Sequence, residues 1–322
     1  MTHPIPPGTR DVLPDEMREL RALTDRMRAA FDRARYGEIH TPALEYEDVL
    51  RLGDERAAGA AYRLFDEHGA VLALRSDATI PIARVVASRY QDAEPPLRFC
   101  YFTHSYRAVD RGVGESREFL QGGLELIGDG GAEGEAEVVT VMVAALEEAG
   151  LRRHRLGVGD SALYRRLLHS FGVREDRHTA VMAALSQRDL VGLEFEVGRL
   201  GLPAAERDEL LRVPEMRGGR EVIDRAGGPV GEALDGLRRL HELLERRGVA
   251  DRVIFDLGLV RALGYYTGVV FEVYDPAVGF TLGGGGRYDD LLGRFGRDLP
   301  ACGIAVDVER VHVAQAAEEA LR

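Results

Sequence analysis

The sequence reads Arg98-Phe-Cys-Tyr-Phe-Thr-His-Ser-Tyr-Arg107 and, after a gap of ten residues, Glu118-Phe-Leu-Gln-Gly-Gly-Leu-Glu125. Aromatic and apolar residues dominate both segments, and this composition is typical of buried strands. We therefore predict strands over residues 97–102 and 119–127.

The second of these strands also carries polar residues in a regular pattern. Alternate residues of a strand share one face, so Phe119, Gln121, Gly123 and Glu125 should point the same way. Two polar groups with a small glycine between them indicate a pocket for a polar small molecule. An edge strand with Gln121 and Glu125 facing solvent would show the same pattern.

Further out from these strands, apolar periodicity predicts helices. Leucines, a methionine and a phenylalanine recur at helical spacing over residues 16–35, and Asp15 precedes them as a candidate N-cap. A second helix is predicted over 132–149, where Gly150 stops it. The remaining predicted strands cover 38–42, 71–74, 252–257, 268–274 and 303–306.

The pattern of apolar and polar residues changes between residues 161 and 247. Strand patterns give way to helical patterns rich in leucine, alanine and arginine, as in 162–171 and 231–247. We predict a helical insertion over 161–248 that divides a core formed by residues 1–160 and 249–322. Hairpin-like returns between the core strands favour an α+β fold with an antiparallel sheet flanked by helices.

Composition and charge exclude several classes of protein. The 322 residues carry a formal net charge of −12, and all 42 basic residues are arginine. An acidic chain is a poor binder of nucleic-acid backbones, so we expect no nucleic-acid partner. Without lysine, neither a Schiff base nor a Walker-type phosphate loop can form.

Cysteine usage and hydropathy indicate in which cellular compartment the protein resides. The two cysteines, Cys100 and Cys302, lie far apart and outside any CxxC motif, and the nine histidines form no HExxH-like cluster. No run of ~18 apolar residues is present, and the first residues lack the form of a signal peptide. We expect a soluble cytoplasmic protein with no disulfide, metal, cofactor or membrane partner.

Two later segments also hold residues suited to a site. The first contains Arg261-Ala-Leu-Gly264-Tyr265-Tyr266-Thr267, followed by four glycines at 283–286 and by Arg287-Tyr288-Asp289. The glycines could form a phosphate cradle, but no GK[ST] follows them, so close backbone packing beside a ligand is the better interpretation. The second segment, residues 301–310, reads as a strand that runs into a helix.

Together these segments resemble the catalytic core of histidyl-tRNA synthetase, a class II aminoacyl-tRNA synthetase, over nearly the whole chain. Residues 7–14 are similar to its N-terminal signature, and Pro42 falls where the first class II motif ends. Arg107 and Arg310 take the positions of the second- and third-motif arginines, while 261–267 and 285–289 resemble the two histidine-specific motifs. The resemblance implies the class II synthetase catalytic-core fold.

Four departures from the synthetase pattern bear on function. Val109 stands where the second motif has an acidic residue that holds ATP, and Gly264 stands where a histidine-specific motif has aspartate. Asp307 replaces a glycine against which adenine lies, and so adds bulk and negative charge there. The chain ends about a dozen residues after Arg310, so we expect no anticodon-binding domain.

A sequence with these departures resembles the synthetase-like regulatory subunits of ATP phosphoribosyltransferase. Those subunits support the first step of histidine biosynthesis. Residues 74–84 are similar to the LRxDxTxxxAR pattern of that family, with Ser76 in place of the usual proline. The resemblance implies a non-catalytic subunit that assembles with the short-form catalytic subunit. It also implies homodimers, formed through residues 30–48, within a hetero-octamer.

The resemblance further implies a site for histidine as an effector, with no catalytic residue. A guanidinium fork suits a carboxylate, and carboxylates suit the ammonium and ring N–H groups. The residues implied are Asp77, Thr79 and Gln121 for the ammonium, Arg261 and Arg107 for the carboxylate, and Glu125, Tyr266 and the neighbouring Tyr265 for the imidazole ring.

Two alternatives remain open at this point. One is a truncated enzyme of the synthetase class, and the other is a scaffold, either histidine-binding or with a vestigial pocket. Val109, Gly264, Asp307 and the chain end favour the regulatory subunit over the enzyme. The sequence leaves open whether histidine acts through this pocket or only through the catalytic partner.

Overall fold

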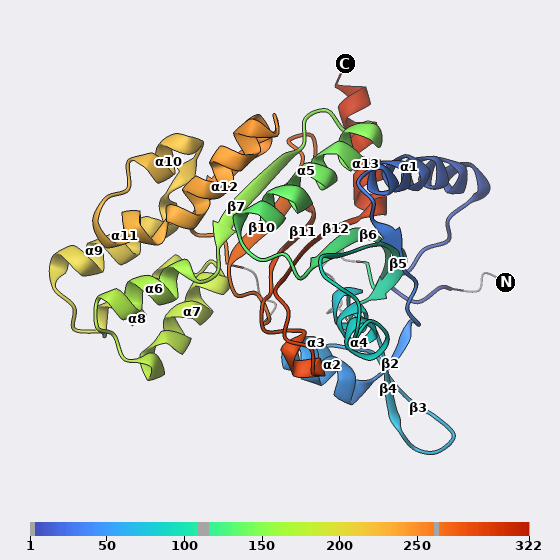
Figure 1. Cartoon of the computed structure of the whole chain (residues 1–322), viewed down its shortest axis with the longest axis horizontal. Helices are drawn as coiled ribbons and strands as arrows, with labels where there is room; N and C mark the ends of the chain where they lie inside the picture. Colours follow the sequence, from blue (N-terminus) through green and yellow to red (C-terminus); the bar gives the residue numbers. More distant parts are fainter. Residues whose placement is uncertain (1–3, 109–115, 261–263, 322) are drawn as a thin grey trace.

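The computed structural model describes residues 4–108, 116–260 and 264–321. Within these ranges its centre is a nine-stranded sheet with helices packed against it (Figure 1). Across the sheet the strands follow the order β1 (Gly37–Glu38), β5 (Leu97–Tyr106), β6 (Glu118–Ile127), β12 (Ala301–Asp307), β11 (Thr281–Arg287), β10 (Val269–Tyr274), β7 (Arg155–Asp160), β9 (Val253–Asp256) and β8 (Arg217–Gly218).

The middle of this sheet is antiparallel, as predicted, but the sheet as a whole is mixed. Strands β5, β6, β12, β11, β10 and β7 pair antiparallel in that order. At one end β1 pairs parallel with β5, and near the other end β9 pairs parallel with β7 and antiparallel with the last strand, β8. Parallel neighbours need a long crossover rather than a hairpin, and the segments between these strands provide one.

Glycine explains the two central strands that sequence analysis missed. Gly157 and Gly159 occupy β7, and the glycines at 283–286 occupy most of β11. Glycine lowers the intrinsic preference for a strand, so neither segment shows a strand pattern. Both become strands because their neighbours on either side supply the backbone hydrogen bonds.

One face of the sheet is covered by α1 (Pro14–Arg33), α5 (Ala132–Glu148) and α13 (Val308–Ala320). The apolar stripe predicted for the first helix is buried there, including Leu23, Met27 and Phe31. The predicted cap at Asp15 is wrong, because the helix begins at Pro14 with Leu13 at the N-cap position. Proline suits the first helical position, where its missing N–H leaves no bond unmade.

The other face carries α4 (Thr79–Arg89), α2 (Glu47–Gly53), α3 (Glu55–Gly59) and a three-stranded sheet of β2 (Leu44–Tyr46), β4 (Val71–Leu74) and β3 (Arg63–Phe65). The strand predicted over 38–42 is wrong beyond Glu38. The carbonyl oxygens of Thr41 and Pro42 accept hydrogen bonds from the side chain of Arg75 instead of from a neighbouring strand.

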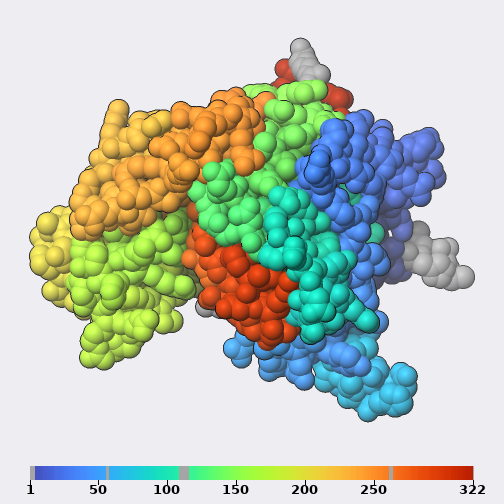
Figure 2. Space-filling view, in the orientation of Figure 1, coloured from blue at the N-terminus to red at the C-terminus, as the bar shows by residue number. Residues whose placement is uncertain are grey.

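Residues 163–246 are helical apart from short turns and β8, and form the lobe at the left of Figures 1 and 2. The helices are α6 (Leu163–Ser170), α7 (His178–Ser186), α8 (Leu190–Gly198), α9 (Ala204–Arg212), α10 (Arg220–Asp224), α11 (Gly228–Ala233) and α12 (Asp235–Arg246). The single helix predicted over 231–247 is split at Leu234, and β8 adds a strand that was not expected. The division of the chain at 160/161 and 248/249 stays a prediction.

Nowhere in the described ranges is a helix both long and apolar enough to cross a membrane.

Candidate binding site

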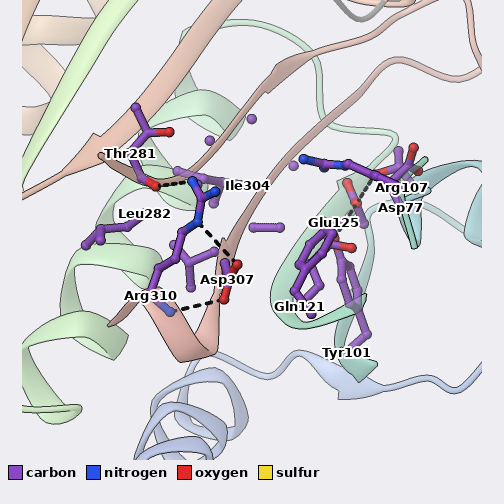
Figure 3. A pocket seen from close by; sticks show the side chains of 18 of the residues that line it. Asp77, Tyr101, Arg107, Gln121, Glu125, Thr281, Leu282, Ile304, Asp307 and Arg310 are labelled. Atoms are coloured by element: carbon purple, nitrogen blue, oxygen red, sulfur yellow. Dashed lines mark hydrogen bonds and ion pairs between the residues drawn. The ribbon is translucent and has the colours of Figure 1, made fainter. Parts of the chain in front are cut away.

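A cavity of about 210 Å³ lies on the face of the sheet that α1, α5 and α13 leave free (Figure 3). Strands β5, β6, β11 and β12 form its floor, and the first turn of α4 together with Tyr265 and Tyr266 forms its walls. The alternation predicted for β6 is confirmed, because Gln121 and Glu125 both line the cavity. The alternative of an edge strand facing solvent is wrong, since β6 lies between β5 and β12.

The structure brings almost all of the sequence-predicted site residues together. The residues that line this one cavity are Asp77, Thr79, Arg107, Gln121, Glu125, Tyr265 and Tyr266. Arg261, predicted to pair with a carboxylate, lies outside the described residues, as does Val109. The segments concerned are up to almost two hundred residues apart in sequence, and the sheet pairing places them side by side.

Glu125 lies at the bottom of the cavity and is almost fully buried, with 1% of its surface exposed. Its carboxylate accepts hydrogen bonds from Thr79 Oγ1 at 2.7 Å, from the Tyr101 hydroxyl at 3.4 Å and from the Tyr288 hydroxyl. Burial raises the pKa of Glu125 to about 7, and the nearby charge of Asp77 adds to the rise. The group can therefore exchange a proton near neutral pH.

Asp77 provides a second buried carboxylate at the same end of the cavity. It lies in the turn before α4, where its Oδ1 accepts from the backbone N–H of Ile80 at 3.2 Å. Burial raises its pKa, and the positive charge of Arg107 opposes that rise. Two carboxylates in one partly enclosed space favour a ligand that carries positive charge or several N–H donors.

Among the cavity residues that sequence reasoning missed are Tyr101 and Tyr288. Both hydroxyls reach Glu125, and the Tyr288 ring meets the Tyr265 ring edge-on with 5.7 Å between centroids. Tyr101 is paired with Gly123 across β5 and β6, and a Cβ at position 123 would come within 2.6 Å of the Tyr101 hydroxyl. The small residue at 123 was therefore the available signal, because it makes room for a large neighbour.

Glycines of strand β11 line the cavity with main-chain atoms rather than with side chains. A Cβ at Gly283 would come within 2.1 Å of the Ala305 carbonyl oxygen, and one at Gly285 within 2.0 Å of the Gly303 carbonyl oxygen. The prediction of close backbone packing is thus confirmed, and the phosphate-cradle alternative is wrong, because these residues form a strand rather than a loop before a helix.

The far end of the cavity holds Asp307 and Arg310, at the junction of β12 and α13 (Figure 3). The Asp307 side chain caps the helix by accepting from the backbone N–H groups of Glu309 and Arg310 at 3.0 and 3.1 Å. It also lies 3.4 Å from Arg310 Nε, while Arg310 Nη1 donates to the Thr281 carbonyl at 2.9 Å. The guanidinium is thereby engaged by groups of the protein itself.

Comparison with known proteins first gives a class. The family model described as histidyl-tRNA synthetase matches residues 8–311. A solved structure titled as an ATP phosphoribosyltransferase regulatory subunit/histidyl-tRNA synthetase from Bacillus halodurans C aligns with a TM-score of 0.90. The two chains are 35% identical, and the alignment covers 98% of this chain and 84% of that one. The fold is therefore that of the histidyl-tRNA synthetase-like proteins.

Curated relatives identify a narrower family within this class of proteins. A protein of Symbiobacterium thermophilum named ATP phosphoribosyltransferase regulatory subunit is 41% identical, covering 98% of this chain and 81% of its own length. A protein of the same name from Desulforamulus reducens is 38% identical, covering 96% of this chain and 78% of its own length. The chain belongs to the family of ATP phosphoribosyltransferase regulatory subunits.

Proposed function

We propose that this protein is the non-catalytic regulatory subunit of an ATP phosphoribosyltransferase and that its cavity binds histidine as a feedback effector. One observation carries the proposal. The end of the cavity suited to an amino acid keeps Asp77, Thr79 and Glu125 in place, whereas at the far end Arg310 is engaged by Asp307. The names of the curated relatives support the same role.

Free histidine offers an ammonium, a carboxylate and an imidazole ring, and the cavity has a candidate partner for each. Asp77, with Thr79 and Gln121, would face the ammonium. The Arg107 guanidinium, which stacks 4.7 Å from the Phe119 ring centroid at the cavity, and Arg261 would pair with the carboxylate. Glu125 and Tyr266 would contact the ring nitrogens, with Tyr265 packed beside Tyr266 at 4.9 Å between ring centroids.

A nucleotide would meet unfavourable chemistry at the far end of the same cavity. The carboxylate of Asp307 is largely buried there and would repel phosphate groups. Arg310, which lines this end of the cavity, already lies against Asp307 and Thr281. We therefore infer that the protein neither adenylates histidine nor charges tRNA.

The partner in this proposal is the short-form catalytic subunit, with which homodimers of this chain would build a hetero-octamer in the cytoplasm. An apolar face supports the homodimer. Leu44, Tyr46 and Leu64 lie on one face of the small sheet β2–β4–β3 and are 43–55% exposed. Strand β2 falls inside the segment 30–48 predicted to form the dimer. Both cysteines are buried and free, which suits a reducing compartment.

Co-purification with a short-form ATP phosphoribosyltransferase tests the proposal most directly. We expect the two chains to elute as one complex, the phosphoribosyltransferase rate to rise when this chain is added, and histidine to inhibit the complex. Separate elution together with an unchanged rate would contradict the regulatory role. Inhibition by histidine that persists in variants of the cavity would instead place the effector site on the catalytic subunit.

A further inference from the structure

Among the residues that the structure describes, Arg75 is the largest side chain that the fold buries almost completely, with 2% of its surface exposed. Its Nε donates to the His104 carbonyl at 2.8 Å, and its Nη1 donates to the Pro42 carbonyl at 3.0 Å and to the Thr41 carbonyl. Its Nη2 donates to the Thr103 hydroxyl. A guanidinium buried at this depth is stable only because so many of its N–H groups have acceptors.

These bonds join two parts of the molecule that the chain itself does not connect directly. Thr103 and His104 belong to β5, which forms part of the cavity floor. Thr41 and Pro42 belong to the segment that leads into β2 and its apolar face. The backbone of Arg75 repeats the connection, because its N–H donates to the Ala43 carbonyl at 3.0 Å and its carbonyl accepts from the Tyr106 N–H at 2.9 Å.

Arg75 also lies directly before the acidic end of the cavity. Asp77 follows two residues later, and Thr79, which donates to Glu125, follows four residues later. The turn from 75 to 80 is therefore held at one end by Arg75 and at the other by the bond from the Ile80 N–H to Asp77. Movement of the guanidinium would move both ligand-facing groups.

We propose that Arg75 is a positioning residue, which fixes Asp77 and Thr79 against the cavity floor and ties them to the segment that carries the apolar sheet face. The proposal rests on the proposed function in so far as it concerns histidine. It makes histidine affinity depend on a side chain that lies outside the cavity. In metal sites, the residues that orient the ligating side chains change affinity by roughly 10–100-fold. We expect an effect of at least about tenfold from Arg75, since a binding site depends in the same way on the residues that support it.

The test compares Arg75→Lys with Arg238→Lys in the 322-residue chain. Arg238 is a matched control because its guanidinium also donates to backbone carbonyls, those of Ile223, Ala226 and Gly231, but within the helical lobe. Lysine keeps the charge in both variants but loses the fork of donors. The measurements are amide hydrogen exchange by mass spectrometry and calorimetric titration with histidine.

For Arg75→Lys we expect exchange at least tenfold faster over residues 39–44 and 75–82, unchanged exchange in α5, and a histidine Kd raised at least tenfold. For Arg238→Lys we expect faster exchange over 223–233 and a Kd within twofold of the wild type. If Arg75→Lys does not fold, Thr103→Val, which removes a single acceptor, should show the same local pattern to a smaller extent.

The result that overturns the proposal is a local exchange rate over 75–82 that stays at the wild-type value in Arg75→Lys, or in Thr103→Val where that variant replaces it. A Kd that stays at the wild-type value while the segment loosens would overturn it as well. If the wild type itself binds no histidine, the proposed function fails, and the exchange rates alone then decide whether Arg75 holds the turn.

Discussion

Glu125 shows how a residue suited to binding destabilises the protein that carries it. Burial raises its pKa from 4.5 to about 7, so the folded chain holds this proton more tightly than the unfolded chain does. The stabilisation that follows is fully present below about pH 4.5 and is lost as the pH rises through 7. Above pH 7 the folded protein therefore keeps a buried charge that water would solvate better.

We expect Glu125→Gln, which cannot ionise, to raise the free energy of unfolding at pH 8 by on the order of 3 kcal/mol and to change it far less at pH 5. Denaturant unfolding at both pH values measures the difference. Glu137→Gln is the control, because Arg98 and Tyr36 bind Glu137 and lower its pKa, so its loss should destabilise at pH 8. A less stable Glu125→Gln protein at pH 8 would show that hydrogen bonds outweigh burial here.

Asp307 is the second single residue with a predicted effect on ligand choice. In Asp307→Gly the buried carboxylate is gone and Arg310 is released, so we expect ATP binding to become measurable by equilibrium dialysis where the wild type shows none. The loss of the N-cap should lower stability by only a few tenths of a kcal/mol, since glycine is itself tolerated there. Asp307→Asn separates charge from bulk. Equal ATP binding by the wild type would refute the inference.

At the scale of the elements, the small sheet β2–β4–β3 carries exposed apolar side chains on one face. The register pairs Leu44 with Leu74 and both Tyr46 and Leu64 with Leu72, so these apolar side chains share a face. Leu44, Tyr46 and Leu64 remain exposed in the single chain. Contiguous apolar surface of this kind typically marks an interface.

We expect Leu64→Asp to convert the proposed dimer into monomers at micromolar concentration, because a carboxylate in an apolar interface must lose its water. Analytical ultracentrifugation gives the mass. Val313→Asp, on α13, changes a similarly exposed apolar residue away from this sheet and should remain dimeric. If Leu64→Asp sediments like the wild type, the dimer forms through another surface.

For the whole molecule, feedback requires that histidine prefer one state of the assembled complex, since equal affinity for two states shifts nothing. We expect Glu125→Ala to assemble normally with the catalytic subunit but to need at least tenfold more histidine for half-inhibition. Loss of a partner in a charged hydrogen bond costs about 1.5–3 kcal/mol, which corresponds to at least tenfold in affinity. Glu118→Ala, at the exposed start of the same strand, is the control.

Local patterns were enough to predict much of this protein. The alternation along β6 placed Gln121 and Glu125 on one face, and helical spacing located α1 and α5, because each pattern reflects which side of one element is buried. Resemblance to family motifs predicted eight site residues. Seven of them line the cavity, and the eighth, Arg261, lies outside the described residues.

Other features depend on contacts between segments that are distant in sequence. The glycine strands β7 and β11 exist because neighbouring strands supply their hydrogen bonds. Tyr288 reaches Glu125 across 163 residues, and the guanidinium of Arg75 donates to carbonyl oxygens that lie 29 to 34 residues away in sequence. No periodicity records such partners, because the energy of a buried polar group is set by which acceptors surround it after the chain has folded.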